Sequence, residues 1–141
     1  MSTGAEALVV DGWLYARLSG DAELSTLVGG RIFSALAPPD TPVPFVVYSS
    51  QTWRDVRGVG PRARILSESV YQVKAIGEGR SFGPLRRIAE RIDELLDGAA
   101  GPADGGEVAG VAREEQLAFV EVDEGTEYRH LGGLYRLWTH A

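Results

Sequence analysis

Cysteine is absent from the chain, and its absence excludes disulfide bridges, thiol catalysis and thiolate metal sites together. Long apolar runs are missing as well, because the run at residues 7–10 is too short for a membrane span or for the core of a secretory signal. We therefore expect no membrane partner and a product that is assembled in the cytoplasm. Stability must come from the packing of one core or from contacts with other chains.

Lysine is almost missing too: Lys74 is the single lysine among 14 basic residues, against 20 acidic residues. The formal net charge is -6 and the isoelectric point is about 4.9. Sequence-independent binding to nucleic acid needs clustered cations that displace counterions, so this balance argues against it. The length of 141 residues suits one domain with one core, and we assign residues 1–141 to a single domain.

Three segments have the periodicity or the capping residues of helices. Residues 6–18 carry apolar side chains at three-to-five-residue spacing, and a short second helix begins at Asp21 as its N-cap and ends at Gly29. Residues 81–96 show the clearest pattern, because apolar positions repeat every three or four residues opposite a charged face. Ser81 is the predicted capping residue of this third helix.

The remaining periodic segments alternate as strands do. Strands are predicted at 31–36, from Pro44 onward, at 63–76, at 108–122 and at 127–139, with a hairpin turn at 123–126. Residues 53–62 are predicted to form an exposed loop and residues 98–106 a flexible loop, from their glycine and polar content. The predicted fold class is α+β, a mixed, mainly antiparallel sheet of about five strands with helices packed on one face.

Candidate catalytic groups are few. The glycines at 77–83 precede a predicted helix, but the third falls one residue late for a dinucleotide fingerprint and Glu78 would repel a pyrophosphate. His130 and His140 share one face of the last strand, without a Gly-x-Ser-x-Gly elbow or carboxylates at metal-ligand spacing. We therefore assign no catalytic, cofactor-binding or metal-binding residue, and we expect no cofactor.

One aromatic residue has the surroundings of an interface anchor. Trp53 lies in the predicted polar loop with Arg54, Arg57 and Arg62, and tryptophan and arginine are enriched where proteins meet. A loop tryptophan that folds back on its own domain is an equal alternative. The strand at 63–76 has two mixed faces, which is typical of a sheet that meets another subunit.

Carboxylates gather toward the end of the chain, at Glu114, Glu115, Glu121, Asp123 and Glu124. Such a group is most often a solvated edge that discourages aggregation between strands. The functional alternative is an acidic rim or lumen, since carboxylates facing a channel would keep a DNA duplex from sticking to it.

Short motifs along most of the chain, from about residue 8 to residue 138, resemble one family. They are Gly29-Gly30-Arg31-Ile32-Phe33, Pro44-Phe45-Val46-Val47, Tyr71-Gln72-Val73 and residues 128–137, in that order of elements. The chain is similar in these motifs to the tail terminator or tail completion proteins of long-tailed bacteriophages.

The resemblance implies a structural virion protein without catalytic residues. It implies a homo-oligomeric ring, usually of six subunits, on the head-proximal end of the tail tube in the neck region. Such a ring ends tube polymerisation by binding the tail tube protein and presents a docking surface for the head connector or stopper protein, while DNA passes through it without specific binding.

Two alternatives stay open at this stage. One is a head–tail adaptor or minor tail component, which would share the ring but lie at another level of the neck. The other is a small α+β enzyme that uses His130 with an acidic partner. An enzyme would show a closed pocket and would be active as a monomer or dimer.

Overall fold

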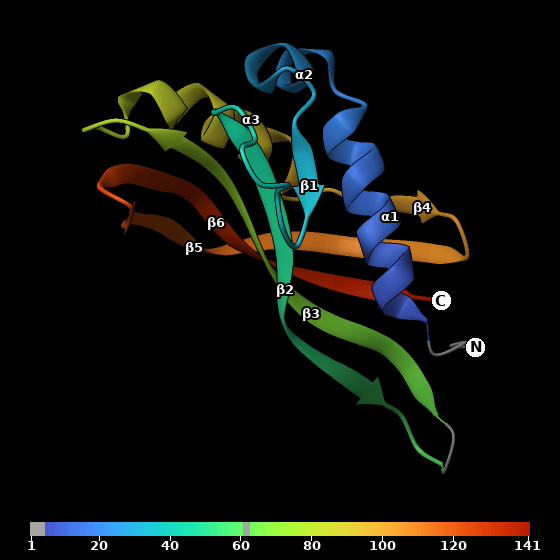
Figure 1. Cartoon of the computed structure of the whole chain (residues 1–141). Coiled ribbons are helices and arrows are strands. Elements are labelled where there is room, and N and C mark those ends of the chain that lie inside the picture. Colours follow the sequence, from blue (N-terminus) through green and yellow to red (C-terminus); the bar gives the residue numbers. More distant parts are fainter. Residues whose placement is uncertain (1–4, 61–62) are drawn as a thin grey trace.

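The computed structural model describes residues 5–60 and 63–141. Within these residues the chain forms helices and strands in the order shown in Figure 1. The elements are α1 (Glu6–Ser19), α2 (Ala22–Val28), β1 (Ile32–Ser34), β2 (Phe45–Arg57), β3 (Arg64–Glu78), the 3-10 turn η1 (Gly83–Leu85), α3 (Arg86–Leu96), β4 (Gly101–Ala103), β5 (Gly106–Asp123) and β6 (Thr126–His140).

The strands form one six-stranded sheet in the order β1-β2-β3-β6-β5-β4. Among the described residues only β1 and β2 pair in parallel, and the other neighbouring pairs are antiparallel. The predicted fold class is therefore confirmed as α+β with a mixed, mainly antiparallel sheet curled into a half-barrel. The extra strand is β4, which lies inside the segment 98–106 predicted as a flexible loop and pairs with the beginning of β5.

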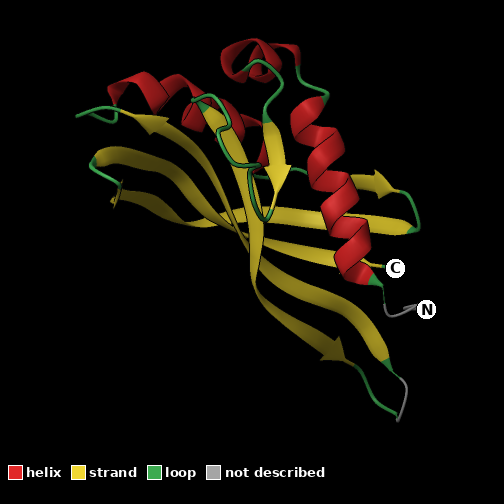
Figure 2. Ribbon diagram, in the orientation of Figure 1, coloured by secondary structure: helices red, strands yellow, loops and turns green. Residues whose placement is uncertain are grey.

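The helices cover one face of the sheet, which we call the core face (Figure 2). Alternate residues of β3 and β6 point into this core, among them Tyr71, Val73, Tyr135 and Leu137. Cross-strand partners share a face, because the side-chain period of a strand is two. The intervening residues of the same strands lie on the opposite side, which we call the second face.

The helix predicted at 81–96 differs at its start. Residues 83–85 form a 3-10 turn and α3 begins only at Arg86. The predicted cap is wrong, since Ser81 makes no capping hydrogen bond to either element. Pro84 supplies the reason, because it has no N–H to donate and its fixed φ favours a tight first turn.

The predicted loop at 53–62 is corrected over its first half. β2 continues to Arg57 and pairs with β3 as far as Arg64, with irregularities between Ser50 and Thr52 and between Val56 and Arg57. We call the projecting part of this hairpin, residues 49–57 of β2 and 64–69 of β3, the arm. A polar segment becomes a strand here because the partner strand satisfies its backbone, whatever the local composition favours.

The N-cap predicted for α2 is confirmed. The backbone N–H of Leu24 donates to Asp21 Oδ2 at 2.9 Å, and Gly29 ends the helix with a φ of 60°. Asp21 also pairs with Arg91 of α3 through an Arg91 Nη2 to Asp21 Oδ1 bond of 2.6 Å. The Arg91 hydrogen bond, helped by that from Leu24, lowers the pKa of Asp21 to about 2.

This pair predicts how stability depends on pH. The pKa of Asp21 is lowered in the fold, so its contribution is complete above the ordinary value of 3.8 and is lost as the pH falls toward 2. Asp21→Ala is expected to lower the free energy of unfolding by about 1–2 kcal/mol at pH 7. Asp21→Asn keeps a cap acceptor, so it should lose less at pH 7 and should flatten the loss between pH 4 and 2. Identical acid profiles of Asp21→Asn and wild type in urea unfolding would contradict this role.

Candidate interaction surface

Four charged side chains connect four neighbouring strands on the second face. Glu68 of β3 accepts from Arg54 of β2 and from Arg136 of β6, whose Nη1 lies 3.0 Å from Glu68 Oε1. Arg136 also donates to Glu114 of β5. Arg54 and, more weakly, Arg136 hold the pKa of Glu68 below its usual range. The two arginines of this row neutralise its two glutamates. Arg54 lies at the margin of the sheet, where its side chain is 74% exposed.

Trp53 and Arg54 lie on opposite faces of the arm. Trp53 pairs across the strands with Ser69 and packs edge-on against Tyr71 at 6.0 Å between ring centroids, so it belongs to the core face. Arg54 lies on the second face, as its partner Glu68 shows, and Arg57 follows a register shift of the two strands after Val56. Trp53 therefore folds back on its own domain, while 36% of it stays exposed. Arg62 lies outside the described residues.

Two arginines face each other near the end of the arm. Arg57 and Arg64 are direct cross-strand partners, and like charges in that position repel. The ion pairs found among the described residues include neither of them. The end of the arm is therefore positively charged. A carboxylate from another molecule would relieve the repulsion between the two arginines.

The predicted acidic residues divide between the β5 strand and its turn. Glu115, Glu121 and Asp123 lie on the second face of β5, as their partners on β6 show, with Leu117 and Phe119 between the first two. Glu114 is held by Arg136, and Glu124 occupies the two-residue turn with φ of 49°. The predicted hairpin is confirmed, because Glu124 and Gly125 both have the positive φ that such turns require.

The two histidines are not brought together. His130 is 5% exposed, stacks on Phe119 at 4.2 Å, and lies 3.2 Å from Glu121 Oε1 through its Nε2. Burial, reinforced by Lys74, lowers its pKa. His140 lies at the other end of β6, with its Nδ1 3.0 Å from the carbonyl oxygen of Ile65. An imidazole covered in this way has little access to a substrate.

Two surface hollows lie beside the helices. One, of about 410 Å³ between α3 and β6, is lined by charged groups that already have partners, as when the Tyr135 hydroxyl donates to Asp93 Oδ1 at 3.0 Å. The other, of about 470 Å³, runs between α1 and β4 and borders Leu8, which is 76% exposed. In residues 5–60 and 63–141, no group of three or more His, Asp or Glu side chains is arranged to hold a metal ion.

Helices long and apolar enough to cross a membrane are not found among the described residues. Sequence reasoning missed two features of the second face, the Glu68–Arg136 connection and the free edges of β2 and β5. Only the pairing of the strands reveals them, since residues 68 and 136 are distant in the chain.

Comparison with known proteins gives two matches. The family model described as tail completion protein gp17 matches residues 13–133. Among solved structures, a chain of the virion of a native gene transfer agent particle superposes with a TM-score of 0.73 at 19% identity, covering 99% of this chain and 100% of that one. At this identity the likeness shows a shared fold. No curated protein sequence matches the chain.

Proposed function

We propose that this chain, which belongs to the tail completion protein gp17 family, is the structural protein that closes the head-proximal end of a phage-type tail tube. It forms a ring of six copies, by analogy with the tail terminators that it resembles. The ring ends tube polymerisation and offers a docking surface to the head connector. The family match over residues 13–133 carries the proposal, and it favours a role without catalysis. The likeness to a chain of a gene transfer agent virion supports the same reading.

The carboxylates of β5 support a ring that DNA traverses. Carboxylates predominate on β5, at Glu114, Glu115 and Glu121, and the net charge of the chain is -6. A duplex passing such a surface is repelled, which prevents sticking. We therefore propose that these carboxylates, with Asp123 and Glu124, face the lumen or its rim.

The decisive experiment compares tail tubes assembled with and without the protein by electron microscopy. We expect tubes of defined length bearing extra density at one end when the protein is present, and overgrown tubes when it is absent. Unchanged lengths and bare ends would contradict the terminator role. Density at another level of the neck, with unchanged tube length, would instead identify a head–tail adaptor or a minor tail component.

A further inference from the structure

The sheet leaves two long backbone edges without a partner strand. β1 pairs only with residues 46–48 of β2, so the outer edge of β2 is free from Ser49 to Arg57 in the described structure. β4 pairs only with residues 106–108 of β5, and Asp97 and Gly98 bind the backbone of Arg113 and Val111. The outer edge of β5 is therefore free from Glu115 to Asp123, a segment of matching length.

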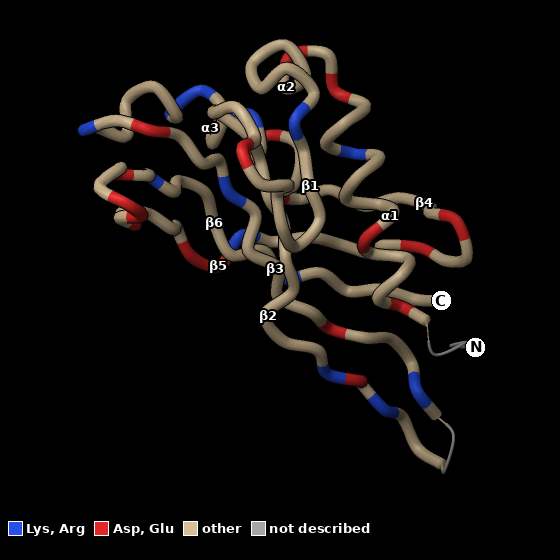
Figure 3. Tube along the Cα trace, viewed as in Figure 1, with Lys and Arg blue, Asp and Glu red and all other residues tan. Residues whose placement is uncertain are grey.

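The two free edges carry charges of opposite sign. The β2 edge presents Arg54 on the second face, and Arg57 lies at the end of the same edge, opposite Arg64. The β5 edge presents Glu115, Glu121 and Asp123 on that face, with the Glu121 side chain 61% exposed. In Figure 3 acidic segments gather near the β5–β6 turn, whereas the arm carries both basic and acidic segments.

Bare strand edges are a hazard that proteins normally block with charge. Here each edge carries mainly one sign and the two edges differ in sign. Two arms repel each other, and so do two β5 edges, whereas an arm and a β5 edge attract. The arrangement thus disfavours pairing between like edges and favours pairing between unlike ones.

We propose that the arm of one copy adds to the free β5 edge of the next copy as an antiparallel strand, so that the sheets join across subunits. The inference rests on the proposed ring, and it identifies the two surfaces that close it. The steps from β2 through β3 and β6 to β5 are all antiparallel, so a sheet continued in the same sense places β2 of one copy antiparallel to β5 of its neighbour. Arg54 then lies on the same face as Glu115, Glu121 and Asp123 of the neighbour, and Arg57 lies in the same paired strand.

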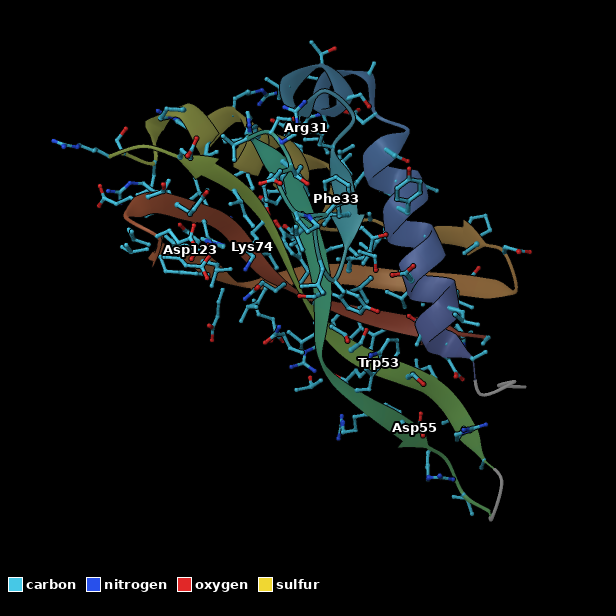
Figure 4. All side chains as sticks on the ribbon, viewed as in Figure 1. Arg31, Phe33, Trp53, Asp55, Lys74 and Asp123 are labelled. Atoms are coloured by element: carbon cyan, nitrogen blue, oxygen red, sulfur yellow. The ribbon has the colours of Figure 1, made fainter. Side chains whose placement is uncertain are left out.

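The positions of the edges specify a head-to-tail contact. Phe119 of β5 aligns through His130 and Ile76 with Phe45, the first residue of β2, so the β5 edge lies at one end of the sheet and the arm at the other. Figure 4 shows the same separation between Asp55 and Asp123. Such a contact joins different surfaces of each copy, so it gives a ring where the rotation closes, an open filament where it does not, and in neither case a two-fold dimer. The stagger between edges means that the strands tilt relative to the ring axis, as they do in closed sheets.

Charge exchange tests the pairing without knowledge of its register. The arm variant carries Arg57→Glu with Arg64→Glu. Because both partners change sign together, the repulsion between them within the arm is the same as in the wild type. The edge variant carries Glu115→Arg with Asp123→Arg. Each variant is expected to weaken ring assembly on the order of a hundredfold. Native mass measurement gives the fraction of rings, both for the protein alone at high concentration and for the protein bound to tail tubes. An equimolar mixture should restore rings, because each variant arm then meets an edge of opposite sign.

The matched control is Arg86→Glu, a reversal of an 80% exposed side chain on α3 that should leave assembly unchanged. Thermal unfolding of every variant identifies any that fails to fold, and rescue in the mixture is itself evidence of folding. A contact between identical surfaces would yield dimers and no larger species in the mixture.

A second measurement uses the absence of cysteine, which gives a clean background. Thr52→Cys is combined in turn with a cysteine at each position from Glu115 to Glu121, and the chain is oxidised mildly. Strand pairing predicts a ladder of cross-linked oligomers whose yield peaks at alternate positions, because only side chains on one face approach closely. Each single-cysteine variant should stay uncross-linked.

The outcomes separate the two proposals. Rings of normal mass in both reversed variants, or cross-linking without a two-residue period, would overturn strand addition while the ring remains. Cross-links from the arm to the tail tube protein, in place of a second copy, would overturn it as well. Absence of any ring from the wild-type protein, alone or on tubes, would overturn the proposed function together with this inference.

Discussion

Gly132→Ala is expected to destabilise the fold more than any other single methyl group added to the sheet, by about 3 kcal/mol or more. Gly132 lies on β6 between Lys74 of β3 and Leu117 of β5. A Cβ added there would lie 2.1 Å from the carbonyl oxygen of Val73 and 2.6 Å from the Cα of Lys74. These are backbone atoms of a paired strand, so they cannot move aside without breaking the ladder.

Gly110→Ala is the matched control on the neighbouring strand. Its added Cβ would lie 3.6 Å from Cε3 of Trp138, an ordinary contact. Its free energy of unfolding should stay within about 0.5 kcal/mol of wild type. Urea unfolding followed by circular dichroism measures both variants, and similar losses would show that the strands are not so close at Gly132.

Leu85→Ala is the second substitution with a large expected effect. Leu85 is 3% exposed in the 3-10 turn before α3 and covers Gly77 of β3, where a Cβ would lie 2.9 Å from its Cδ2. Truncation removes a buried side chain and leaves a cavity, so the free energy of unfolding should fall by about 2–5 kcal/mol.

Arg86→Ala, one residue later, provides the comparison. Its side chain is 80% exposed and pairs only with Glu90, at 3.2 Å, which contributes about 0.3–0.5 kcal/mol. Chemical unfolding at neutral pH gives the ratio of the two losses. Equal losses would contradict the packing of this turn against the sheet.

Where the sequence pattern was strong, the structure agrees with it. The helix predicted at 6–18 is α1 (Glu6–Ser19), and the hairpin predicted at 108–139 is formed by β5 and β6. Both depend on information within a few residues: a helical repeat in one, a Glu-Gly turn between alternating strands in the other. Such local preferences act before any tertiary contact forms.

The errors arise where distant residues decide. Trp53 to Arg57 became strand because β3 offers a partner, and Gly101–Ala103 became β4 because β5 begins beside it. The cap predicted at Ser81 failed for a local reason instead, the stiff turn at Pro84. In the first two cases glycine and charge content predicted loops, although backbone pairing outweighs composition.

By itself, the sequence determined the fold class, the caps of α2, the β5–β6 turn, and a resemblance that the family match bears out, because each depends on residue types at short spacing. Only the tertiary structure decided which charges meet. Glu68 joins Arg54 to Arg136 because strand order places β3 between β2 and β6, and no local pattern encodes that order. The free edges of β2 and β5 have the same origin, since a strand lacks a partner only when the whole sheet is assembled and its neighbours prove too short to cover it.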